Sequence, residues 1–121
     1  MDTSILDNSI LDDIKGMIGI LADDINFDTD IIIYINNSFD ILSQLGVSCV
    51  EQFRIVDKND KWGDIEGLEP HQVDSLKTYI YIKVKLMFDP PLNSSILQSY
   101  KETMREMEWR LNIAHDENEE V

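Results

Sequence analysis

Carboxylates are the side chains of this chain with the clearest chemical potential. Among its 121 residues, 24 are Asp or Glu and only 10 are Lys or Arg, which leaves a net charge of −14. Paired aspartates of this kind could bind a divalent cation weakly. Helix capping and solvated surface explain them better, because Asp favours N-caps and first helical turns. The pairs are Asp12–Asp13, Asp23–Asp24 and Asp28/Asp30.

A second acidic segment resembles the start of a calcium-binding loop. Asp57, Asn59 and Lys61 follow the alternating spacing of such a loop. The pattern then fails, since Trp62 stands where glycine is needed and Leu68 stands where the bidentate glutamate should be. We therefore predict no metal site.

Nucleophilic and cofactor chemistry have little support. Cys49 is the single cysteine, and nothing local supplies the base that a catalytic thiol needs, so we interpret it as a half-buried thiol. The histidines, His71 and His115, lie far apart in sequence. The chain has no phosphate loop, no dinucleotide glycine pattern and no paired-histidine zinc motif. We predict a protein that is not an enzyme and binds no cofactor.

Composition limits the class of protein. A chain of this length suits one domain, and no apolar run reaches the roughly 18 residues of a membrane span. Residues 1–4 lack a basic n-region, which predicts a protein that stays in a cytoplasm or assembles there, away from membranes. The charge opposes tight nucleic-acid binding. Three interpretations of the charge remain: a solvated surface, an acidic face for a basic protein partner, or a passage through which DNA slides without sticking. Composition favours the solvated surface.

Two helices are predicted in the first half of the chain. The first runs from Ile10 to about Ile18, with Ser9 as its N-cap. The second follows a cap at Asp28 or Thr29 and ends at Leu45, before Gly46. Ile32 and Ile33 widen its apolar line, so this helix covers either a neighbouring subunit or the first helix. The main line is Ile31, Ile35, Phe39, Leu42 and Leu45.

The middle of the chain, from residue 47 to residue 68, loses the helical period. Phe53–Val56 is a strand candidate, Asp57–Asp60 reads as a turn, and Lys61–Trp62 would return along it. We expect a small β-hairpin or an extended loop.

A third helix is predicted from Pro70 to the residue before Asp89. Pro is favoured in the first turn of a helix, and Pro90 disfavours the helical conformation at Asp89. Its core line is Val73, Leu76, Ile80, Val84 and Met87. Three lysines make this helix basic, whereas the first 30 residues carry eight Asp and one Lys. These opposite charges could pair within one chain or between subunits.

A fourth helix is predicted from about Ser95 to Ala114, with Trp109 off its apolar stripe. That stripe is Leu97, Tyr100, Met104, Met107, Leu111 and Ala114. Residues 1–114 then form a single domain, followed by an acidic flexible tail at 115–121. The predicted class is mainly α, a four-helix bundle-like domain with a small central β-hairpin or loop insertion.

With these parts placed, the chain resembles the head–tail connector proteins of tailed bacteriophages, also called adaptor, head-completion or DNA-packaging proteins. The likeness spans about residues 5–115. Four segments carry it in order: the Ile10–Lys15 helix before an Asp-rich loop, Phe27–Asp30 leading into an isoleucine-rich helix that ends Gln44–Val47, Lys77–Pro91 with its Lys-Val-Lys-Leu-Met-Phe-Asp-Pro-Pro core, and Glu108–Asn112.

The resemblance implies a ring, typically a dodecamer, beneath the portal in the neck of the virion. During assembly of the virion the protein would be in the host cytoplasm. Such a ring extends the DNA channel, completes the head after packaging, and docks the tail or a stopper protein. Its inner wall is acidic and its C-terminal segment reaches the portal. The self-repelling charge of the chain favours weak self-affinity, with free monomers that assemble only on the portal. DNA passes without being bound.

Three sets of residues become candidates on this basis. Subunit contacts are assigned to Ile32, Ile33, Tyr81 and Trp109. Portal docking is assigned to Asn112, Ile113, Ala114 and His115. The channel lumen or the next ring is assigned to Asp57, Asp60, Trp62 and Asp64. The competing hypothesis is a small acidic binding module, such as an inhibitor that mimics DNA, although the basic third helix does not suit such a decoy.

Overall fold

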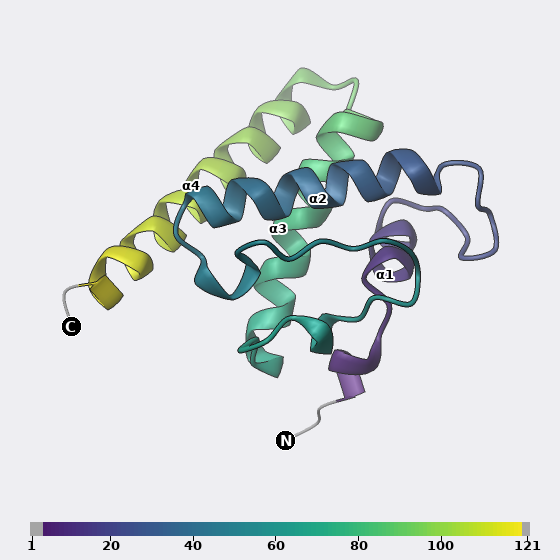
Figure 1. Cartoon of the computed structure of the whole chain (residues 1–121). Helices are drawn as coiled ribbons and strands as arrows, with labels where there is room; N and C mark the ends of the chain where they lie inside the picture. Colours follow the sequence, from purple (N-terminus) through teal and green to yellow (C-terminus); the bar gives the residue numbers. More distant parts are fainter. Residues whose placement is uncertain (1–3, 120–121) are drawn as a thin grey trace.

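Helices account for all the regular structure in the part of the chain described by this computed structural model, which covers the backbone of residues 4–119 and the side chains of residues 4–110 (Figure 1). No strand forms within that part, where Ser9 and Lys61 make one isolated antiparallel bridge. The predicted mainly α, bundle-like class is confirmed. The α-helices are α1 (Ile10–Met17), α2 (Asp28–Gln44), α3 (Pro70–Phe88) and α4 (Ser94–Glu119), and the 3-10 turns are η1 (Ser4–Asp7), η2 (Ser48–Val50) and η3 (Trp62–Asp64).

Local signals set most of the helix ends. The Ser9 hydroxyl accepts a hydrogen bond from the Asp12 amide at 3.2 Å and caps α1. Gly46 ends α2 with a φ of 97°, a conformation that glycine adopts without strain. Pro70 is the first residue of α3. The predicted cap of α2 is wrong, because Phe27 occupies that position without a side-chain cap and Asp28 is already helical.

The core lies around α3, which contacts α1, α2 and α4 (Figure 1). Contact on several sides buries more than one stripe, so Tyr79 and Ile82 are buried beside the predicted line. The prediction for Met87 is wrong, since its side chain is 38% exposed near the end of the helix. Its predicted partners on that line are all buried: Val73, Leu76, Ile80 and Val84.

The segment between η2 and η3 is a loop, and its predicted strand at 53–56 is absent from the described structure. A side chain replaces the missing strand partner. The Asn36 amide donates to the Ile55 carbonyl at 3.0 Å and accepts from the Ile55 amide at 2.8 Å. These two bonds satisfy the backbone of buried Ile55 without a neighbouring strand.

Trp62 closes this loop onto the N-terminal segment. Its ring is fully buried, and its indole N–H donates to Asp13 Oδ2 at 2.8 Å. The next residue must be small, because a Cβ atom on Gly63 would lie 2.9 Å from the Leu6 carbonyl oxygen. The loop is therefore held by a specific side chain and a close backbone approach.

Candidate functional site

The predicted lumen residues separate into two groups. Asp57 and Asp64 are exposed and Asp60 is partly exposed, so these carboxylates face solvent. They also accept backbone N–H groups of their own loop, from Asn59 at 2.8 Å in the case of Asp57. The assignment of Trp62 to the lumen is wrong, because its side chain belongs to the core.

The four predicted subunit-contact residues differ in how much surface they leave free. Ile33 on α2 is 50% exposed and Trp109 on α4 is 64% exposed, so both present apolar surface to solvent. Ile32 and Tyr81 are only half-buried and pack against the core of their own chain. A hydrogen bond to Tyr100 and partial burial both raise the pKa of Tyr81. Their role as contacts stays a prediction.

The predicted portal-docking residues, Asn112 to His115, belong to the backbone of α4. Their side chains lie outside the described residues. The docking assignment stays a prediction.

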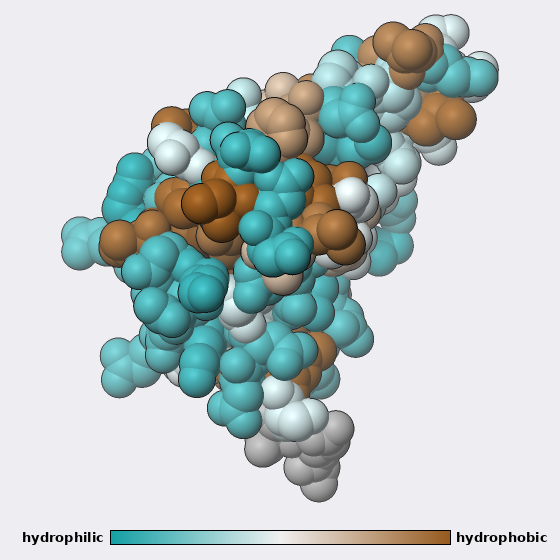
Figure 2. Space-filling model, turned by 90° about the vertical axis from the view of Figure 1, so that its right-hand side faces the viewer, coloured by the Kyte–Doolittle hydropathy of each residue, from teal (hydrophilic) through white to brown (hydrophobic). Residues whose placement is uncertain are grey.

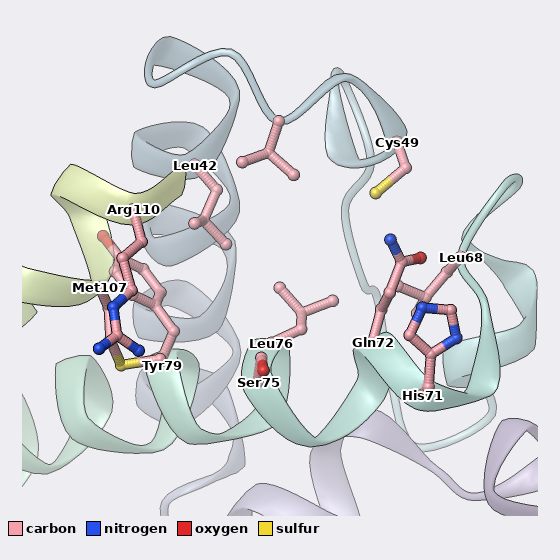
Figure 3. A pocket seen from close by; sticks show the side chains of 11 residues that line it. Leu42, Cys49, Leu68, His71, Gln72, Ser75, Leu76, Tyr79, Met107 and Arg110 are labelled. Carbon is pink, nitrogen blue, oxygen red and sulfur yellow. The ribbon is translucent and has the colours of Figure 1, made fainter. Parts of the chain in front are cut away.

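A groove of about 350 Å³ lies between the end of α2, the start of α3 and the middle of α4 (Figure 3). Its walls are mostly apolar, and none of the described residues that line it is an Asp or Glu. Burial raises the pKa of the Cys49 thiol on one wall. The lining is Leu42, Val47, Cys49, Leu68, His71, Gln72, Ser75, Leu76, Tyr79, Met107 and Arg110. This groove could not be predicted from the sequence, because its residues come from four separate segments.

The α3–α4 wall of the groove is held by a polar contact. The buried Tyr79 hydroxyl donates to Glu108 Oε2 at 2.7 Å, and Lys83 Nζ lies 3.6 Å from the same oxygen. Burial raises the pKa of Tyr79 above its ordinary value, and the Glu108 carboxylate raises it further. This contact joins the two long helices along one wall of the groove.

Replacing Tyr79 with phenylalanine is expected to lower the free energy of unfolding by about 1 kcal/mol, through the lost hydrogen bond. The variant should also lose less stability than the wild type as the pH rises into the alkaline range. Above pH 10.0 an unfolded tyrosine loses its proton while the folded Tyr79 keeps it, so stability falls as pH rises further. Urea unfolding between pH 8 and 11 measures this, and an unchanged alkaline slope in the variant would contradict it.

A second surface is the α1–α2 loop, residues 18–27. It carries exposed apolar side chains: Leu21 is 75% exposed, Ile25 72% and Phe27 42%. The Phe27 ring packs edge-to-face against Phe88 of α3, with the ring centroids 5.3 Å apart. Figure 2 shows apolar surface gathered on the side of the molecule to which this loop projects in Figure 1.

A buried lysine holds that loop. Lys15 is fully buried, and its Nζ donates to the Ala22 carbonyl at 3.1 Å and lies 2.8 Å from Asp28 Oδ1. The contact with Asp28 is a short ion pair, and the carboxylate oxygen that makes it is itself buried. A second pair, Lys77 with Asp13 at 3.1 Å, joins α3 to α1. Some of the opposite charges predicted to pair therefore do so within one chain.

The described residues contain no group of three or more side chains placed to hold a metal ion. None of the helices in this part of the chain is both long and apolar enough to cross a membrane.

Comparison with known proteins identifies a family. A family model described as "Phage connector protein" matches residues 10–118, and so includes all four α-helices almost to the end of α4. No curated protein and no solved structure matches the chain.

Proposed function

The chain belongs to the phage connector protein family, and from that premise we propose that it forms a ring under the portal that extends the DNA channel and connects head to tail after packaging. The family resemblance seen in the sequence is confirmed, and the chain is a structural protein of phage particles. The observation that carries the proposal is the extent of the match, which covers nearly the whole chain.

The charge of the chain supports a channel through which DNA moves. With a net charge of −14, a ring of these subunits would repel the phosphate backbone instead of binding it. Asp57 and Asp64 are exposed carboxylates that suit such a wall. The basic residues of α3 are partly committed to ion pairs in the chain, as Lys77 is with Asp13 and Lys83 with Glu108.

The C-terminal half of α4 suits contact with the portal. Figure 1 shows this helix projecting beyond the other elements, and Met107 is the last of its described residues that packs on the core. We propose that residues 112–115 dock on the portal and that a tail or stopper protein binds the opposite side of the ring. The location would be the neck of the virion.

The test uses phage heads made without this protein, mixed with the purified chain and imaged by electron microscopy. We expect a ring of added density at the portal vertex, and recovery of tail attachment. Portal vertices that stay bare at high protein concentration would contradict the proposal. A protein that instead inhibits a nuclease or a DNA-binding protein would support the acidic-decoy hypothesis, which the lysines of α3 do not favour.

Deleting residues 113–121 is expected to abolish docking on the portal and to leave the fold intact. The free energy of unfolding should change by no more than about 0.5 kcal/mol, because the described core contacts of α4 end before the deletion. Thermal unfolding checks the fold, and co-sedimentation with heads checks docking, which should weaken by about tenfold or more. Undiminished co-sedimentation would disprove the assignment of docking to this segment.

A further inference from the structure

The exposed loop and the apolar groove lie at opposite ends of α2. The α1–α2 loop leads directly into Asp28, the first residue of that helix, while Leu42 in its last turn and Val47 just beyond it line the groove. A helix of 17 residues is about 25 Å long. One chain therefore cannot place this loop in its own groove (Figure 1).

The loop is arranged as a binding element before it meets a partner. Besides the Lys15 contacts, the Asp24 amide donates to the Leu21 carbonyl at 3.0 Å and the Asn26 amide donates to Asp24 Oδ1 at 3.1 Å. These bonds order a segment that holds Leu21 and Ile25 in solvent. Exposed apolar side chains on a preordered loop are typical of a contact surface, since little entropy is lost on binding.

The groove is complementary to this loop in polarity and in charge. Its walls are apolar, and its charged or ionisable edge is formed by His71 and Arg110, with no carboxylate among the described lining residues. Arg110 pairs with Glu106 at 2.6 Å on the surface, where such a pair is weak and easily exchanged. In so acidic a chain, a groove of this composition favours a segment that carries aspartates between apolar side chains, as Asp23 and Asp24 lie between Leu21 and Ile25.

We propose that the α1–α2 loop of one copy docks in this groove of a second copy, with Leu21 and Ile25 against the apolar walls and Asp23 and Asp24 facing Arg110 and His71. The inference rests on the proposed self-assembly of the connector and identifies the two surfaces that meet. Because the two surfaces differ, the contact is heterologous, and repetition of it builds a ring when the rotation closes.

The native Cys49 on the groove wall provides a direct test. An Ile25→Cys variant, treated at high protein concentration with a short bis-maleimide, should give a ladder of cross-linked dimers and higher multimers. A Val56→Cys variant is the matched control, because Val56 is as exposed, at 76%, but lies outside the loop. Adding Cys49→Ser to Ile25→Cys should remove the ladder. Equal cross-linking at residue 56, or a ladder that survives Cys49→Ser, would overturn the inference.

A mixing experiment tests the heterologous character of the contact. Ile25→Asp blocks the loop and Ser75→Trp fills the groove, and both sites are exposed, so circular dichroism should show an unchanged fold. Each variant alone should be monomeric by sedimentation velocity. Mixed together, they should form a dimer that grows no further, because one partner retains a loop and the other a groove. Two variants that stay monomeric on mixing, or that still assemble alone, would refute the contact.

The result can be separated from the proposed function as a whole. If the wild-type chain forms rings on heads but the cross-link and the mixed dimer fail, the loop–groove contact is wrong and the connector role stands. If the contact forms in solution while heads stay bare, self-association is right and the portal assignment fails.

Discussion

Replacing Trp62 with alanine is expected to lower the free energy of unfolding by about 3–5 kcal/mol. This loss is a large share of the total free energy of unfolding of a small domain. The indole is fully buried, and its N–H donates to Asp13. Asp13 also pairs with Lys77, whose ammonium lies 5.8 Å from the centre of the Trp62 ring. The substitution leaves a cavity and removes a shared partner from both charged groups. Chemical denaturation followed by circular dichroism measures the loss.

Trp109 provides the matched control within the same chain. Its side chain is 64% exposed on α4, so Trp109→Ala should change the free energy of unfolding by no more than about 0.5 kcal/mol. Any effect of that variant should appear in assembly, since Trp109 is a predicted subunit contact. Similar losses of stability in the two variants would show that Trp62 is not the structural centre of the loop.

Replacing Lys15 with methionine is expected to lower the free energy of unfolding by about 2–3 kcal/mol. Methionine keeps most of the buried volume but leaves the Ala22 carbonyl and the Asp28 carboxylate without the ammonium. Removing one partner of a fully buried ion pair costs about 3–5 kcal/mol. We expect a smaller loss here because the Asp28 side chain is 25% exposed. Urea unfolding at neutral pH provides the measurement.

Lys58→Met serves as the control for Lys15→Met, because Lys58 is exposed in the loop before η3. It removes the same charge from the chain and should leave stability within about 0.5 kcal/mol of the wild type. The Lys15 variant should also lose the loop–groove cross-link, since the loop is no longer held. A stable Lys15→Met protein would mean that the α1–α2 loop is ordered by other contacts.

Most of the helix boundaries could be predicted because their causes are local. The end of α4 is an exception, since this helix continues to Glu119, past the predicted end at Ala114. Ser9, Gly46 and Pro70 each act within one turn of the backbone that they cap, start or end. The apolar spacing of α2 likewise predicted its buried face. The same local reasoning misplaced the start of α2, where Asp28 turns toward Lys15 on another helix instead of capping its own.

Features that depend on distant segments could not be predicted in this way. The burial of Trp62 depends on Asp13, 49 residues earlier. The burial of Lys15 depends on the backbone carbonyl of residue 22. Every residue type carries such a carbonyl, so the residue type at this position does not indicate the contact. The groove needs four segments at once. The family likeness indicated a connector, but the surfaces by which copies could meet required the three-dimensional arrangement.

The closure of the middle loop over the N-terminal segment has a consequence for synthesis on the ribosome. The Ile10 amide donates to the Asp60 carbonyl and the Trp62 amide donates to the Asn8 carbonyl, so the start of the chain is completed by residues made much later. Because α1 contacts both α2 and α3, its apolar face is fully covered only after α3 has emerged. Folding is therefore expected to be largely post-translational, and growing chains with an uncovered N-terminus are natural substrates for the host's chaperones.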